Sequence, residues 1–445
     1  MPRARYKQVV DTFVTRIRSG ELRPGDRLPT HRQLASEHRL ALATASRVYA
    51  ELEAMGLVSG ETGRGTFVRE ISLPPGLGVD QQAAANDIVD LNFNYPSLPE
   101  QAELLRTALR QLSTSGDLDA FLRYQPHAGR MHEREIVAAH LIDRGLHVDP
   151  CNLLLVDGAQ HGLTTTMMSL LKTGDVVATD ALTYPGMKVL ADSLGLELAA
   201  VPTLGSGPDL EALERLCQRR RVQAIYTQPT VHNPLGWVMD IEQRNALVEL
   251  ARRHNLILIE DAPYAFLEPH SPPPIAALAP ERTVYVSGFS KSVATGLRVG
   301  FVTAPGEWIP RIERAIRATT WNTPGVMTAI ACGWVEDGTV NRLEAAKRKD
   351  AAARQVVALE TLQGMDVISH PASYFLWLPL LEEVRADRVV RELLDHGILV
   401  STAAPFATSA QPPQAIRIAL GSVELNILRR SLATIRQIVE YHAFG

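Results

Sequence analysis

The feature that most constrains the fold is a regular alternation of short apolar runs with longer helical stretches, beginning at Leu153. Seven such runs fall at residues 153–156, 176–179, 198–201, 224–227, 256–259, 284–286 and 300–302. Short buried strands that alternate with helices predict an α/β body with a mainly parallel sheet. Ligands bind such sheets at the carboxyl ends of the strands, so the loops that follow these runs are where chemistry is expected.

Length and composition limit the class of protein. With 445 residues, of which 46% are hydrophobic and 21% charged, the chain predicts two or three globular domains. No apolar run reaches the roughly 18 residues of a membrane span, and the charged N-terminus is unlike a secretory signal. Cys151, Cys217 and Cys332 are widely spaced, which favours free thiols over disulfides or a metal site. We therefore expect a cytoplasmic protein with no metal and no membrane partner.

Residues 1–70 form a basic head, with 12 Lys/Arg against 8 Asp/Glu in a chain whose net charge is −4. Their pattern predicts three helices, over 6–19, after Thr30 and over 44–55, followed by two short strands at 57–59 and 65–68. Thr30 and Gln33 have the spacing of a capping box. Three short helices and a β-hairpin indicate a winged helix-turn-helix that binds double-stranded DNA, and the alternative is a purely structural helical hairpin.

Residues 71–88 are rich in Pro, Gly and small polar residues and show no hydrophobic period, which predicts a flexible linker. The body then runs over 89–445. We expect a large parallel-sheet domain in it and a smaller α+β C-terminal subdomain from about residue 325.

Lys291 lies in a small-residue loop between two apolar runs, in SGFSKSVATGLRVGF. Desolvation favours the neutral amine that attacks carbonyls, so this lysine is a candidate Schiff-base nucleophile. The alternative is a partly buried lysine at a strand end. The chain has only six lysines, and Lys7, Lys347 and Lys349 lie in charged, helix-like surroundings instead.

Other candidates follow other strands. Small residues 157–162 open a helix and predict a phosphate cradle or an ordinary βα turn. Tyr184 would stack on a flat ring or simply pack. Asn233 is placed to donate to a phenolate oxygen, whereas Asp261 would pair with a pyridinium N–H or cap a helix.

The head resembles the GntR family of DNA-binding domains through SGELRPGDRLPTHRQLA, YAELEAMGLV and GRGTFV. This resemblance implies that DNA contacts come from Arg32, Thr44, Arg47 and Arg64, with Arg64 on the wing. Where that family commonly has Ser-Arg, this chain has Ala41-Leu42. Ala41 lacks a capping side chain worth about 1 kcal/mol, and Leu42 cannot contact phosphate or guanine.

The body resembles the fold-type I pyridoxal-phosphate enzymes of the aspartate aminotransferase group, through QPTVHNPLG, EDAPY and the Lys291 segment. The resemblance implies pyridoxal 5'-phosphate as cofactor. It makes Lys291 the Schiff-base residue, pairs Asp261 with the ring nitrogen and places Asn233 and Tyr264 at the ring oxygen. The residues implied to stack on the ring or to hold the phosphate are Tyr184, Gly158, Ala159, Gln160, Ser290 and Arg298.

Two further residues carry implied roles. Tyr124 matches a tyrosine that reaches the phosphate of the neighbouring subunit, which implies a homodimer. Arg417 matches the arginine that binds a substrate α-carboxylate, and its apolar flanks favour a buried, paired side chain over a surface charge. Residues 371–377 depart from the Gly-Gly that aminotransferases often place near the substrate.

Taken over its whole length, the chain resembles the MocR family of transcriptional regulators. The resemblance implies a regulator that binds pyridoxal phosphate as an aldimine on Lys291 and responds to a small amine, an amino acid or a vitamin B6-related effector. One alternative is a working aminotransferase with an ancillary DNA-binding head. Another is a regulator that senses the cofactor alone.

Overall fold

The computed structural model describes residues 5–18, 21–23, 26–55, 57–61, 65–68, 88–114, 118–409 and 411–444. The head comprises α1 (Arg5–Arg18), α2 (His31–Glu37), α3 (Leu42–Ala54), β1 (Val58–Glu61) and β2 (Gly65–Val68). The two strands pair antiparallel, so the predicted winged helix-turn-helix is confirmed. Arg64 and all of the predicted linker except residue 88 lie outside the described residues.

The head is held together by local caps and a small apolar core. Thr30 accepts from the backbone N–H of Gln33, whose side chain accepts from the Thr30 backbone N–H, as the capping box predicts. Ala41 caps α3 without a side-chain hydrogen bond. Phe13, Leu34 and Val48, from the three helices, are buried together.

The central sheet has seven strands in the order β4-β12-β11-β10-β9-β5-β6. All seven predicted strands are present: β4 (Leu153–Val156), β5 (Val176–Asp180), β6 (Glu197–Val201), β9 (Val222–Thr227), β10 (Ile257–Asp261), β11 (Thr283–Gly288) and β12 (Gly300–Thr303). Only β12 runs antiparallel to its neighbours within this sheet. The predicted loop at Lys291 is instead a single helical turn, α11 (Phe289–Ser292).

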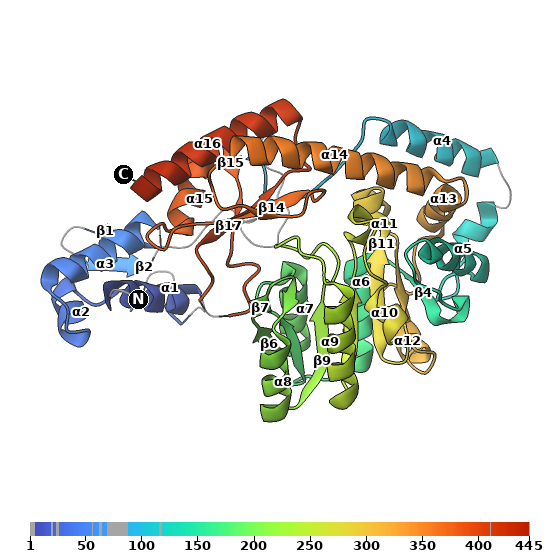
Figure 1. Ribbon diagram of the computed structural model, residues 1–445, viewed down its shortest axis with the longest axis horizontal. Helices are drawn as coiled ribbons and strands as arrows, with labels where there is room; N and C mark the ends of the chain where they lie inside the picture. Colours follow the sequence, from blue (N-terminus) through green and yellow to red (C-terminus); the bar gives the residue numbers. More distant parts are fainter. Residues whose placement is uncertain are drawn as a thin grey trace.

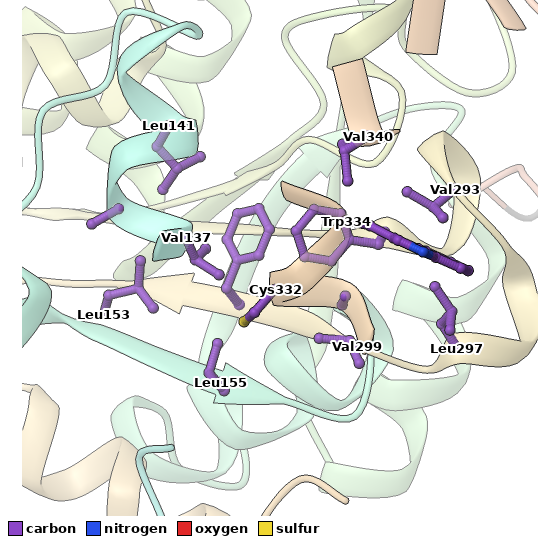
Figure 2. Packing of buried hydrophobic residues seen from close by; sticks show 14 of the residues in the cluster. Val137, Leu141, Leu153, Leu155, Val293, Leu297, Val299, Cys332, Trp334 and Val340 are labelled. Carbon is purple, nitrogen blue, oxygen red and sulfur yellow. The ribbon is translucent and has the colours of Figure 1, made fainter. Parts of the chain in front are cut away.

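Helices cover both faces of this sheet, which is why its strands are apolar throughout rather than alternating (Figure 1). Along the chain, the helices of this domain are α4 (Gln101–Thr114), which packs on α13, α5 (Met131–Ile142), α6 (Ala159–Leu170), α7 (Pro185–Leu194), α8 (Leu210–Arg219), α9 (Ile241–Arg253), α10 (Ile275–Leu278), α12 (Ile309–Thr319) and α13 (Gly325–Glu336). On one face Leu155 packs with Val137 of α5 and Trp334 of α13 (Figure 2). On the other, Val156 packs with Leu163 of α6 and Ile312 of α12.

The long helix α14 (Thr339–Thr361) leads into a four-stranded antiparallel sheet in the order β13-β14-β17-β16. The strands are β13 (Ile368–Ser369), β14 (Phe375–Pro379), β16 (Ser401–Thr402) and β17 (Ala415–Ala419), and the helices that accompany them are α15 (Ala386–Asp395) and α16 (Leu425–Phe444). Two short strands, β3 (Val89–Asp90) and β15 (Ile398–Leu399), pair beside it. The head lies against this part of the molecule, next to α15 (Figure 1).

Candidate functional site

A cavity of about 610 Å³ opens at the carboxyl ends of the central strands, between the large sheet and β17. It brings together residues that are far apart in the sequence. Ten of the residues singled out in the sequence line it: Ala159, Gln160, Tyr184, Asn233, Asp261, Tyr264, Ser290, Lys291, Arg298 and Arg417.

One end of the cavity has the geometry of an anion cradle. Gly158 caps α6 with φ 81°, and a Cβ there would lie 2.8 Å from the guanidinium of Arg298. Arg298 donates from Nη2 to the carbonyl of Asp157 at 2.9 Å, and its Nη1 lies 3.5 Å from Ser290 Oγ. A helix N-terminus with exposed N–H groups beside an arginine fork suits a phosphate group.

Asp261 is the last residue of β10 and is buried, with its two oxygens in different situations. Oδ2 accepts from the Tyr226 hydroxyl and from Gln228 Nε2, each at 2.7 Å. Oδ1 is buried with no hydrogen-bond partner among the described residues. Burial raises the pKa of Asp261 to about 6, against the two donors, which lower it. An unpartnered carboxylate oxygen of this kind fits a cationic N–H donor and not a helix cap.

The loop after β9 positions Asn233. Gln228 Oε1 accepts from the Asn233 backbone N–H at 3.1 Å, so one amide holds both Asp261 and Asn233. His232 stacks on Trp237 with ring centres 4.1 Å apart, and the Asn233–Pro234 peptide bond is cis. The Asn233 Oδ1 atom is buried without a partner in the part of the chain that the structure describes.

Lys291 points its amine toward the cavity and donates to the carbonyl of Asn94 at 3.2 Å. Lys347, which the sequence placed in charged, helix-like surroundings, is on a helix but fully buried beneath α11. Its Nζ donates to the carbonyls of Lys291 and Val293 at 3.1 and 2.5 Å. Burial, followed by the charge of Lys291, lowers the pKa of Lys347 to about 8. Lys347 therefore fixes the backbone that carries Lys291.

Arg417 lies on β17 with 4% of its surface exposed, so it is no surface charge. Nη1 donates to the carbonyl of Asn92 at 2.8 Å, and Nε has no partner among the described residues. The guanidinium lies 5.0 Å from the Phe375 ring centre and 5.9 Å from that of Phe406. Burial lowers the pKa of Arg417 to about 10, an effect that Tyr264 opposes. A desolvated guanidinium at the cavity wall suits a carboxylate ligand.

Sequence reasoning missed Tyr226, Gln228 and Lys347. Tyr226 and Gln228 are polar groups at the end of an apolar strand, which is a weak signal for a buried network. Lys347 gave no sequence signal, because its surroundings on α14 are charged.

The remaining predicted residues lie outside the cavity. Tyr124 is 84% exposed and packs against Trp321, 5.4 Å between ring centres. On the head, Arg32 and Arg47 are exposed and Thr44 is half-buried. The Arg47 guanidinium lies 4.5 Å from the Tyr6 ring centre. The phosphate contact of Tyr124 and the DNA contacts of the head residues stay predictions.

The described residues contain no cluster of His, Cys, Asp and Glu that could hold a metal ion. Among the helices described, none combines the length and apolar character needed to cross a bilayer.

A fold-type I sheet with this cavity, preceded by a winged helix-turn-helix, defines a regulator built on an aminotransferase scaffold. Residues 86–432 match the family of class I and II aminotransferases, and residues 5–68 match the gntR family of bacterial regulatory proteins. The chain therefore belongs to the class I and II aminotransferase family, and its GntR head gives it the architecture of the MocR-type transcriptional regulators. That aminotransferase fold typically binds pyridoxal phosphate.

Relatives match over nearly the whole chain. The chain is 25% identical to the uncharacterized HTH-type transcriptional regulator YdeF of Bacillus subtilis, over 98% of this chain and 94% of that one. It is 26% identical to the HTH-type pyridoxine biosynthesis transcriptional regulator PdxR of Corynebacterium glutamicum, over 97% and 95%. Among solved structures, an archaeal alanine:glyoxylate aminotransferase superposes with a TM-score of 0.74 at 25% identity, covering 80% of this chain and 91% of that one.

Proposed function

We propose that this transcriptional regulator binds pyridoxal 5'-phosphate in the cavity at Lys291 and responds there to a small amine, an amino acid or a vitamin B6-related effector. The observation that carries the proposal is the unpartnered Oδ1 of Asp261, a residue that lines the same cavity as Lys291 and Arg298. An anion site, a buried carboxylate and an amine at one cavity match the phosphate, the ring nitrogen and the aldehyde of this cofactor.

Each of these residues has a proposed role in binding the cofactor. The N-terminus of α6, with Gly158, Ala159 and Gln160, would hold the phosphate together with Ser290 and Arg298. Asp261 Oδ1 would accept the ring N–H, Asn233 and Tyr264 would lie at the ring oxygen, and Tyr184 would stack on the ring. When bound, pyridoxal phosphate supplies an aldehyde that condenses with amines and a ring that withdraws electrons.

Arg417 supports an effector that carries a carboxylate. Its guanidinium is buried at the cavity wall, and one of its nitrogens lacks a partner among the described residues. An effector that exchanged with Lys291 would act on the protein only through different affinities for two conformations. The name of the relative PdxR connects that protein to pyridoxine biosynthesis, which supports testing the cofactor itself as the signal.

A homodimer is part of the proposal. Tyr124 is too exposed to act in its own cavity, and Leu122 and Trp321 nearby are also exposed hydrophobic residues. An exposed apolar patch of this kind favours a protein partner, and a second copy would bring Tyr124 to the neighbouring phosphate site. As a DNA-binding regulator the dimer would act in the cytoplasm on a double-stranded operator, with Arg32, Thr44, Arg47 and Arg64 as the contacts.

Working aminotransferase activity is a second candidate, because Arg417 and nine of the predicted cofactor-side residues line the same cavity. Turnover of an amino acid with a keto acid at ordinary enzyme rates would favour it. The proposal itself is tested by absorbance: added pyridoxal phosphate should give a protein-bound band that Lys291→Ala abolishes and Lys349→Ala, at an exposed lysine, leaves intact. A wild-type protein that stays colourless would refute the site.

A further inference from the structure

A second cavity, of about 310 Å³, lies between the head and the body. Lys7, Asp11 and Thr15 of α1 line its head side. Arg385 and Gln414 are among the residues that line its body side. The head is therefore in direct contact with the body as well as connected to it through the chain.

Arg385 is the main ionic contact across this boundary. It precedes α15 and is only 8% exposed. Nη1 lies 2.8 Å from Asp11 Oδ1 on α1, and Nε lies 3.4 Å from Glu51 Oε2 on α3. One buried guanidinium thus binds two helices of the head, including the predicted recognition helix. Because it is shielded from solvent, the attraction between Arg385 and the two carboxylates is screened less than that of an exposed ion pair.

The segment 403–409, between β16 and β17, forms a wall that both cavities share. Phe406 lines the ligand cavity beside Arg417. Ala404, Ala407 and Ser409 line the cavity at the head. A displacement of this segment therefore changes both cavities at once.

Hydrogen bonds connect this wall to the ring-stacking end of the ligand cavity. The backbone N–H of Thr183 donates to the carbonyl of Phe406 at 2.8 Å, next to Tyr184. Lys188, which also lines the cavity at the head, donates from Nζ to the carbonyl of Ala404 at 3.0 Å. The wall is thus hydrogen-bonded to residues before and after Tyr184.

Hydrogen bonds also connect the wall to Arg385. The backbone N–H of Ala403 donates to the carbonyl of Ala415 at 3.1 Å, at the start of β17. The preceding Gln414 accepts through Oε1 from the backbone N–H of Ala386 at 2.9 Å, directly after Arg385. A continuous path of bonds, through the backbone and the Gln414 side chain, therefore runs from Tyr184 and Phe406 to the arginine that holds the head.

We propose that the segment 403–409 transmits occupancy of the ligand cavity to the Arg385 contact and so changes how firmly the head is held. This inference rests on the proposed function, since the ligand is the one assigned there. A ligand that packs on Phe406 and pairs with Arg417 favours one position of the wall, and the position of the wall sets that of Gln414 and Arg385. By linkage, the effect is reciprocal: loosening the head changes ligand affinity by the same factor.

Hydrogen exchange of the full-length protein tests this path. Amides of residues 5–18 and of 403–409 are followed without ligand, with pyridoxal phosphate, and with phosphopyridoxyl-L-alanine, a stable conjugate of cofactor and amino acid. In the wild type we expect ligand to change exchange by about fivefold or more in both segments. In Arg385→Gln the response should persist in 403–409 and disappear in 5–18. Arg388→Gln, at an exposed arginine on the first turn of α15, should behave as wild type.

Lys188→Met gives an independent check that leaves the Arg385 contact intact, and it should weaken the response of residues 5–18 to ligand. The inference is overturned if residues 5–18 respond to ligand equally in wild type and Arg385→Gln, or if they do not respond in the wild type although the cofactor absorbance band forms. In the latter case the proposed function stands without it. If no band forms, both are refuted.

Discussion

Replacing Gln228 by methionine should raise the pKa of Asp261 and weaken cofactor binding at neutral pH. The Gln228 amide donates to Asp261 Oδ2 at 2.7 Å, and Gln228→Met removes that donor at similar volume. A hydrogen bond to a charged group contributes about 1.5–3 kcal/mol, and one pKa unit corresponds to about 1.4 kcal/mol. The pKa of Asp261, raised to about 6 in the wild type, should therefore rise by about one to two further units in the variant.

The sign of the effect on cofactor binding follows from the carboxylate. Only ionised Asp261 pairs with a pyridinium N–H, so affinity for pyridoxal phosphate should fall as pH drops through the pKa of Asp261. The wild-type midpoint is expected near pH 6. In Gln228→Met it should move to between about 7 and 8, so that affinity at pH 7 falls by roughly twofold to tenfold and recovers near pH 9.

Equilibrium dialysis across pH is the assay, in a Lys291→Ala background so that only non-covalent binding of the cofactor is measured. Gln223→Met is the matched control, because Gln223 lies on β9, the strand that Gln228 follows, and is not a hydrogen-bond partner of Asp261. The reasoning fails if the pH profiles of Gln228→Met and Gln223→Met coincide while both variants still bind the cofactor.

Other substitutions probe the rest of the molecule. Gly158→Ala should weaken cofactor binding by at least tenfold, because its Cβ would lie 2.8 Å from the Arg298 guanidinium at φ 81°; retained affinity by dialysis would contradict the cradle. The change in melting temperature caused by Lys347→Met should be more favourable at pH 7 than at pH 10. The pKa of Lys347 is lowered to about 8, so at pH 7 the charged amine destabilises the folded state and its removal relieves this; equal changes at both pH values would contradict the reasoning. Ala41→Ser should supply the missing cap of α3 and stabilise the head by about 1 kcal/mol in denaturant titrations, unlike Ala43→Ser within the helix. Arg47→Ala should abolish the salt-sensitive binding, in gel-shift assays, of DNA from upstream of the protein's own gene, and unchanged binding would refute the predicted recognition helix.

The sequence determined the parts of this protein that depend on neighbours in the chain. The alternation of apolar runs with helical stretches predicted the seven strands of the central sheet, because burial on both faces requires continuous apolar residues. The capping box of α2 followed from Thr30 and Gln33, and the missing side-chain cap of α3 followed from Ala41, because these contacts are local. The strand-end motifs also singled out Asp261 and Lys291 as candidates, and these residues line one cavity because the carboxyl ends of parallel strands converge at one edge.

The tertiary structure decided what surrounds those residues. Tyr226 and Gln228 hold Asp261 across 35 and 33 residues, and Lys347 reaches Lys291 across 56. Arg385 contacts the head across 374 residues, where no periodicity or motif relates the partners. Such contacts arise only when helices and strands pack, because burial then forces each polar group to find a partner wherever the fold places one. The candidate site residues could thus be proposed from local motifs, whereas the contacts that surround them and the contact with the head depend on packing.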